Sequence, residues 1–151
     1  MKHAQVQNDT IIKIHNKLPG SWNNISNLDA LSPEQLSDLG WSGNEGVRFY
    51  PVEEATRPEF NPLYKINDPE YTIDDINHKV IQSYSTTPVS EETAWDIIRQ
   101  QRNNKLYQSD WTQLEDAPLS ADQKAEYRVY RQALRDITTQ SDPFNIVWPV
   151  I

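Results

Sequence analysis

The clearest structural signal in the chain is the stretch SEETAWDIIRQQRNNKLY, which covers residues 90–107. Its first turn holds two acids, where the helix dipole favours negative charge. Ala94, Ile97 and Ile98 lie on one stripe at helical spacing, and basic residues fall in the later turns, the end that favours cations. This pattern predicts a helix from Ser90 to about Tyr107.

A second helix follows after a loop. Ser120 and Gln123 have the spacing of a capping box, and apolar residues recur at helical intervals from Ala121 to about Thr138. Two helices joined by a loop form a helical hairpin. The remaining residues, 143–151, are apolar and include Pro149, so we expect an extended arm that packs on another surface.

The N-terminal half has the patterns of short strands. Asn8 and Asp9 favour a tight turn between residues 4–7 and 10–14. Another hairpin is expected from residues 70–74 and 79–85, and a short helix from Ser32 that stops at Gly40. Residues 47–52 read as an edge strand, because Pro51 cannot donate a ladder hydrogen bond, and residues 57–63 read as extended coil.

These elements predict an α+β fold. A small antiparallel β-rich unit with proline-rich connections should occupy residues 1–89. The helical hairpin with its apolar arm should form a second domain, residues 90–151.

The composition excludes several classes of function. The chain has 151 residues and a formal charge of −8, so its surface should repel nucleic acid and anionic membranes. It has no cysteine, which removes disulfides, thiolate zinc sites and cysteine nucleophiles. No apolar run is long enough to span a membrane, and the first residues lack the apolar core of a signal peptide. We therefore expect a cytoplasmic protein, or one packed into a particle assembled there.

No catalytic or cofactor motif is present. His3, His15 and His78 lack a second histidine at metal-ligand spacing, so we expect no metal site. The adjacent acid pairs point apart in strands and helices, unlike the paired carboxylates of a glycosidase. Four glycines could hardly build a phosphate loop. We expect a protein that is not an enzyme and takes no cofactor. A small hydrolase ranks as the last of three functional hypotheses, because the chain lacks a nucleophile motif, metal ligands and a phosphate loop.

The candidate functional residues are aromatic and basic side chains of the C-terminal region. Arginines at intervals of three and four share one face of the second predicted helix, beside tyrosines, and such residues are frequent in protein interfaces. Two alternatives stay open, namely core packing for the tryptophans and a solvated face with internal ion pairs for the arginines. The predicted partner-binding residues are Trp111, Tyr127, Arg128, Tyr130, Arg131, Arg135 and Trp148.

Four blocks of the C-terminal region occur together in a known family. They are RNNKL at residues 102–106, SDWTQL at 109–114, YRQALRDI at 130–137 and WP at 148–149. In this order, over roughly residues 90–151, the chain resembles the phage tail assembly chaperones, often called tail fibre assembly proteins. Residues 18–41 look like the opening of phage tail-associated proteins, and Tyr127 stands where the family often has tryptophan.

The resemblance implies binding to a phage tail fibre or related tail protein during virion assembly, with no catalytic residues to carry over. We expect no nucleic acid or membrane partner, and a homo-oligomer matched to a trimeric fibre stays open. The alternative function is a permanent structural virion protein, such as an adaptor on the fibre or baseplate. The expected location is the host cytoplasm during assembly, with retention in the virion tail left open.

Overall fold

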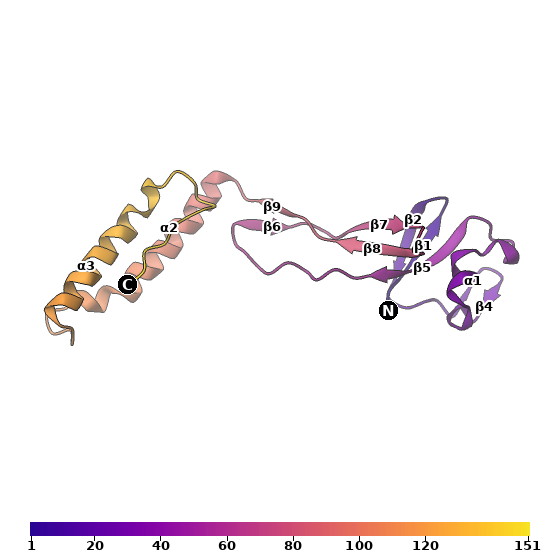
Figure 1. The fold of residues 1–151 in the computed structure, drawn as a ribbon, viewed down its shortest axis with the longest axis horizontal. Coiled ribbons are helices and arrows are strands. Elements are labelled where there is room, and N and C mark those ends of the chain that lie inside the picture. Colours follow the sequence, from indigo (N-terminus) through magenta and orange to yellow (C-terminus); the bar gives the residue numbers. More distant parts are fainter. The chain divides into compact units, whose positions relative to one another are not determined.

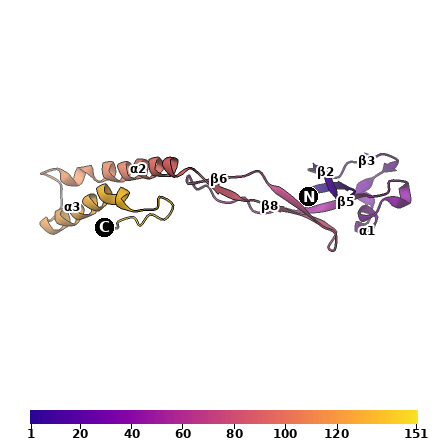
Figure 2. The same ribbon diagram turned by 90° about the horizontal axis from the view of Figure 1, so that it is seen from above.

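The computed structural model describes all residues, 1–151, and combines a β-rich N-terminal portion with C-terminal helices (Figures 1 and 2). The predicted α+β class is confirmed. The chain divides into two compact units: unit 1 comprises Met1–Glu59 and Ile66–Ser85, and unit 2 comprises Phe60–Lys65 and Thr86–Ile151. The division into domains 1–89 and 90–151 stays a prediction.

Unit 1 is built on a five-stranded sheet with the order β2-β1-β5-β8-β7. Its first hairpin is the predicted one, with β1 (His3–Gln7) antiparallel to β2 (Thr10–His15). Asn8 and Asp9 join the strands with left-handed backbone angles, φ 48° and 60°, which these residue types tolerate. The ladder shifts register between Gln5 and Val6, so β2 contains a bulge.

The second predicted hairpin also forms. β7 (Glu70–Asp74) pairs antiparallel with β8 (Lys79–Ser83) in an unbroken register. His78 ends the turn in the left-handed region, at φ 53°.

The expectation for residues 47–52 is wrong in one respect. β5 (Val47–Glu53) is the central strand of the sheet, antiparallel to β1 and parallel to β8. The Val52 N–H donates to the Lys2 carbonyl at 2.9 Å, so the backbone N–H of Val52 points toward β1. Because the backbone groups of successive strand residues point in opposite directions, the nitrogen of Pro51 points toward the β8 side. Pairing with β8 begins only at Val52, so the missing N–H of Pro51 costs no ladder bond.

The predicted short helix is α1 (Pro33–Ser37), with the capping box between Ser32 and Gln35 in place. It ends before Gly40, which instead opens a 3-10 turn, η2 (Gly40–Ser42). Before α1, the structure adds three elements that were not predicted: the strands β3 (Ser21–Trp22) and β4 (Ile25–Ser26), which form a miniature hairpin, and the 3-10 turn η1 (Leu28–Ala30).

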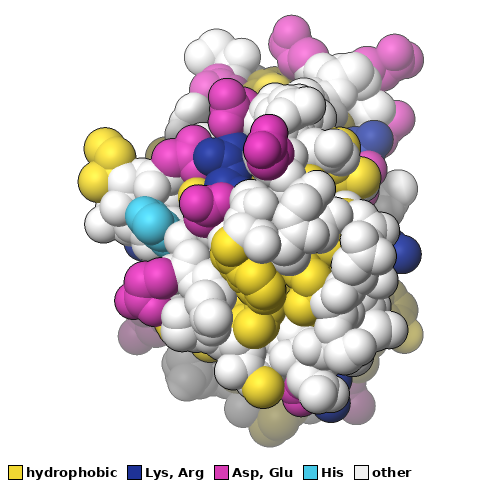
Figure 3. Space-filling view, turned by 90° about the vertical axis from the view of Figure 1, so that its right-hand side faces the viewer, with side chains coloured by type: hydrophobic (Ala, Val, Ile, Leu, Met, Phe, Trp, Pro, Cys, Tyr) yellow, Lys and Arg dark blue, Asp and Glu magenta, His cyan; other side chains and the backbone are white.

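Two apolar clusters stabilise unit 1, one on each face of β5. Cluster 1 holds Phe49 with side chains from α1 and its flanking loops, and the ring of Trp22 meets Phe49 edge-on at 5.6 Å. Figure 3, in which unit 1 faces the viewer, shows hydrophobic side chains gathered in a hollow of this surface. Cluster 2 lies on the other face of β5, because successive side chains of a strand point to opposite faces. It consists of Ala4, Val6, Tyr50, Val52 and Val80.

Unit 2 includes a two-stranded pairing of β9 (Thr86–Pro88) with β6 (Tyr64–Ile66), of which only the last residue belongs to unit 1. Two helices follow, α2 (Glu91–Gln108) and α3 (Ala121–Arg135), and they lie side by side in both views (Figures 1 and 2). The predicted helical hairpin is present. Two 3-10 segments complete it: η3 (Asp110–Gln113) in the connection and η4 (Asp136–Thr139) after α3.

Candidate partner-binding surface

The helical hairpin of unit 2 is fixed first by its helix starts. The Ser90 hydroxyl accepts from the Thr93 N–H at the start of α2, and Ser120 and Gln123 form a reciprocal capping box on α3. Both arrangements satisfy backbone N–H groups that a helix start otherwise leaves unpaired. The buried apolar side chains of the unit are few, namely Ala94, Ile98, Leu134, Ile137 and Pro143, so polar contacts contribute much to its geometry.

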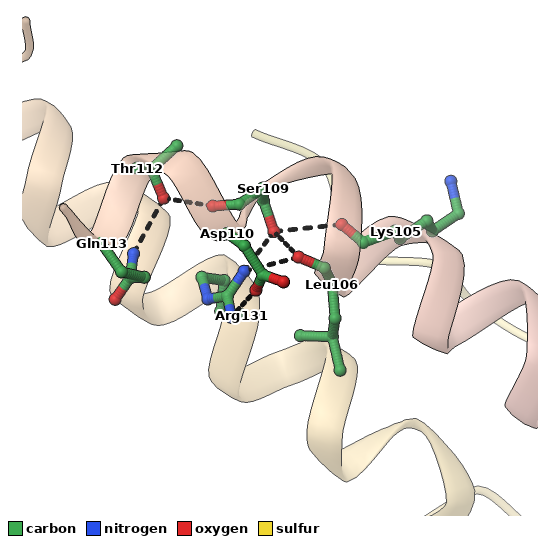
Figure 4. Close-up of polar contacts among 7 residues, drawn as sticks. All are labelled: Lys105, Leu106, Ser109, Asp110, Thr112, Gln113 and Arg131. Carbon is green, nitrogen blue, oxygen red and sulfur yellow. Dashed lines mark hydrogen bonds and ion pairs between the residues drawn. The ribbon is translucent and has the colours of Figure 1, made fainter. Parts of the chain in front are cut away.

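Arg131 makes the central polar contact (Figure 4). Its Nη1 donates to the Leu106 carbonyl at 2.7 Å and to the Ser109 Oγ at 2.6 Å, and its Nη2 donates to Asp110 Oδ1 at 2.7 Å. A cation at the end of α2 also meets the negative pole of the helix dipole. Arg131 is buried, so it joins α3 to the end of α2 and leaves no exposed guanidinium.

The SDWTQL segment supplies the other half of this contact. The Ser109 hydroxyl donates to the carbonyls of Lys105 and Leu106, and the buried Thr112 hydroxyl donates to the Ser109 carbonyl at 2.7 Å. The Gln113 amide then donates to the Thr112 hydroxyl at 2.8 Å. The polar side chains of this segment thus stabilise the connection between the helices.

Trp111 lies differently from its polar neighbours. Its ring meets Tyr127 edge-on at 6.1 Å, yet 45% of the residue is exposed. Edge-to-face aromatic pairs have a preferred geometry, so Tyr127 holds the indole in a defined position at the surface. Leu114, a few residues along, is 58% exposed. Core packing therefore accounts for only part of Trp111.

The outer face of α3 carries the two remaining arginines. Arg128 and Arg135 are exposed and form no ion pair, so the predicted face of three arginines is reduced to these two. Arg128 lines a polar groove with residues of η3 and with Lys124, whose Nζ donates to the Glu115 carbonyl. Val129, the next residue after Arg128, is 71% exposed.

The C-terminal arm packs on its own unit. The Gln140 side chain accepts from the Val147 N–H at 2.9 Å and donates to the Val147 carbonyl at 3.0 Å, as a neighbouring strand would. The Lys105 ammonium lies 5.3 Å from the centre of the Trp148 ring, a cation–π contact with α2. Hydrogen bonds from Asn145 and Phe144 to the Asp142 carboxylate lower its pKa and fix the preceding turn.

Beyond Trp148 the arm borders an open apolar groove of about 540 Å³ on α3. Tyr130, half-buried, is one of its lining residues, and the arm contributes Pro149 with the exposed Val150 and Ile151. The helix side is completed by Ala125, Glu126, Val129 and Ala133.

The structure thus brings the predicted residues to three places. Trp111, Tyr127 and Arg128 lie at the η3 end of the hairpin, Tyr130 lines the apolar groove, and Trp148 lies over Lys105. Partner binding by these residues stays a prediction.

The sequence reasoning missed other side chains that shape this surface. It missed Ser109 and Gln140, which hold the surface in place by hydrogen bonds to distant residues. Ser109 accepts from Arg131 of α3, and Gln140 donates to Val147 of the C-terminal arm. It also missed exposed apolar side chains, of which Tyr107 at 77% is the largest. The available signal was Val129, a β-branched apolar residue among the polar residues of α3.

Two further observations concern other kinds of site. The structure contains no cluster of three or more histidine, aspartate or glutamate residues able to hold a metal ion. None of its helices is both long and apolar enough to cross a membrane.

Comparison with known proteins gives one match. Residues 95–151 match the family described as phage tail assembly chaperone protein. The resemblance of the C-terminal region is thereby confirmed, and the matched residues include most of α2, η3, α3 and the arm. No curated protein and no solved structure matches the chain. The family match supports a role in phage tail assembly, with interaction with phage tail proteins.

Proposed function

We propose that this protein is a phage tail fibre assembly chaperone, which binds a tail fibre or related tail protein in the host cytoplasm during virion assembly. The observation that carries the proposal is the family match of residues 95–151, which coincides with the hairpin that exposes Trp111. The role is one of binding and needs no catalytic group.

The physical argument starts from the client. Fibres rich in non-local β pairing fold slowly and expose apolar surface and strand edges meanwhile. A small acidic protein with aromatic and arginine anchors can cover such surface without consuming ATP, because burial of apolar area and charge-assisted hydrogen bonds supply the affinity.

The proposed contact surface has two parts on unit 2. The first is formed by Trp111, Tyr127 and Arg128 at the η3 end of the hairpin, where the indole is about half exposed and Arg128 is exposed. The second is the apolar groove lined by Tyr130 and by the arm residues that follow Trp148, and Arg135 adds charge on the same helix. Aromatic residues and arginine carry a large share of the binding energy in protein interfaces.

The test is co-expression with the tail fibre protein of the same phage. We expect the fibre expressed alone to be insoluble or to fail to trimerise, and the fibre expressed with this protein to be recovered as soluble trimers on size-exclusion chromatography. Soluble, normal trimers from the fibre alone would refute the proposal.

A matched pair of variants locates the surface. Trp111→Ala removes a 45% exposed indole from unit 2, and Trp41→Ala removes a 59% exposed indole from unit 1. The yield of soluble fibre should fall with Trp111→Ala and remain with Trp41→Ala, provided that circular dichroism shows both variants folded. Equal yields from the two would exclude the surface around Trp111.

Mass spectrometry of purified virions distinguishes the chaperone from a permanent structural protein. An assembly factor that leaves after folding its client should be absent or substoichiometric in particles. A fixed stoichiometry in the tail would instead identify the protein as a virion component.

A further inference from the structure

The sheet of unit 1 ends in two strands with a free edge. β2 pairs only with β1, and β7 pairs only with β8. A strand with one neighbour leaves a row of backbone N–H and C=O groups on its other side, and such an edge can accept a further strand.

The two free edges border the same open groove, which has a volume of about 420 Å³. Under it lies cluster 2, whose outer layer is incompletely covered: Ile11, Ile14, Tyr71 and Ile73 pack against the cluster but remain partly exposed. An added strand with apolar residues on one face would cover them. The lining residues are Asp9, Thr10 and Ile11 on one side and Tyr71, Thr72 and Ile73 on the other.

Of the two edges, β7 is the one suited to accept a strand. β2 is interrupted by the bulge and carries the exposed Lys13, two features that discourage edge pairing. β7 runs in continuous register with β8 and contains neither proline nor lysine.

Charge indicates what kind of segment fits. Unit 1 contains six Lys and Arg against twelve Asp and Glu, so its formal charge is 6 − 12 = −6 of the total −8. On β7, Glu70 and Asp74 flank the exposed Thr72, while Tyr71 and Ile73 turn toward cluster 2. A strand beside β7 is favoured when its apolar residues alternate with basic ones, because opposite charges on paired strands attract.

We propose that the β7 edge of unit 1 binds an extended segment of the client, with alternating apolar and basic residues, as an added β-strand. That the client is a tail protein rests on the proposed function; the groove, its edge and its charge do not. Unit 1 would then hold an unpaired strand of the folding client, while unit 2 holds the client through its aromatic surface.

The test uses the full chain and a synthetic peptide, Lys-Val-Lys-Val-Thr-Val-Lys-Val, as the probe. Hydrogen exchange followed by mass spectrometry should show new protection of residues 70–74 when the peptide is present. Added protection confined to unit 2, or none, would overturn the proposal.

Two N-methylated peptides of the same sequence sharpen the test. One is methylated at alternate residues and the other at the residues between them. Addition to a single edge uses only every second N–H of the incoming strand, so one of these peptides should protect β7 and the other should not. Equal protection by both would exclude strand addition.

A charge pair provides the matched variants. Glu70→Lys reverses an exposed charge on β7, and Glu45→Lys makes the same change elsewhere in unit 1. The first should weaken peptide binding roughly threefold at low salt, the effect of one exposed ion pair, and the second should not. Equal affinities of the two variants would contradict the charge argument.

Two other outcomes are informative. Dimers in sedimentation, with β7 protected before any peptide is added, would show that a second copy occupies the edge and would overturn the proposal. Peptide binding together with failure to solubilise the fibre would leave strand capture standing and remove only the fibre as client. If the protein forms a complex with the fibre but the peptide does not protect β7, the proposed function stands and strand capture by β7 is overturned.

Discussion

Three arginines on α3 differ in what surrounds them, although their spacing places them on one side of the helix. Arg131 faces the end of α2 and is buried among three acceptors, whereas Arg128 and Arg135 remain exposed and without an ion pair. A buried guanidinium with several charge-assisted hydrogen bonds mainly fixes structure, and an exposed one is available for other contacts.

Replacement of Arg131 should therefore destabilise the helical hairpin. Arg131→Ala removes three hydrogen bonds and leaves the Leu106 carbonyl and the Ser109 hydroxyl without this donor, at a cost of about 2 kcal/mol or more in the free energy of unfolding. Chemical denaturation followed by tryptophan fluorescence measures the change. Arg135→Ala, the control on the same helix, should cost less than about 0.5 kcal/mol.

A similar loss from both arginine variants would contradict the assignment of Arg131 to structure. Arg131→Lys adds a finer comparison. Lysine keeps the charge but lacks the planar fork that reaches Leu106 and Asp110 together, so it should restore only part of the stability.

His3 and His15 lie directly opposite each other on β1 and β2 and predict a pH dependence of unit 1. Burial lowers the pKa of both side chains from the usual 6.5, and the His3 Nδ1 is buried without a hydrogen-bond partner. The unfolded chain then binds protons first as the pH falls below 6.5, so stability is lost on acidification and is unaffected by these groups above that value.

Thermal unfolding at about pH 7.5 and about pH 5.5 measures this effect, in a window where histidine is the side chain that ordinarily titrates. The wild-type chain should be less stable at the lower pH. The variant with both His3→Gln and His15→Gln should have nearly the same midpoint at the two values. An undiminished difference in the double variant would assign the pH dependence to other groups.

At the scale of elements, the helices of unit 2 depend on their first residues. Ser120 accepts from the Gln123 N–H at 3.2 Å, and the Gln123 side chain accepts from the Ser120 N–H at 2.9 Å. Because the unit has a small apolar core, the stability of each helix end contributes a large share of the whole.

Ser120→Ala should reduce the free energy of unfolding by about 1 kcal/mol, the usual cost of losing an N-cap side chain. Loss of helical circular dichroism on heating provides the measurement. Ser141→Ala is a control outside any helix and should leave the midpoint unchanged. A midpoint unaffected by Ser120→Ala would show that this cap does not limit the stability of α3.

The elements that could be predicted from the sequence are those whose causes are local. The Ser32 and Ser120 capping boxes and the Asn8-Asp9 turn involve residues within a few positions of each other, and all three form. The central position of β5 could not be predicted, because its parallel partner β8 comes later in the chain, only after β6 and β7. Likewise, helical spacing groups Arg131 with Arg128 but does not show which of them faces α2.

At the scale of the whole molecule, unit 1 is assembled from two separate segments of the chain. β5 belongs to the first segment, and its partner β8 belongs to the second, after residues that pack in unit 2. The link between them includes residues 54–61, which form no helix or strand. Strand pairing, and not only the covalent link, therefore holds the sheet together.

Limited proteolysis tests this arrangement. A protease specific for glutamate should cut early after Glu59, which is exposed and lies in the link. The two fragments should stay together on size-exclusion chromatography and separate only in denaturant, because the pairing of β5 with β8 joins them. Fragments that separate without denaturant would contradict the observed sheet order.

The parallel pairing of β5 with β8 also sets the order of events during translation. When residues 1–59 have left the ribosome, the nascent chain can form the β1–β2 hairpin and add β5, but the far side of β5 near Val52 has no neighbour. That side stays open until residue 83 emerges, so the N-terminal sheet of this protein passes through an intermediate with an unpaired stretch of β5 before α2 has left the ribosome.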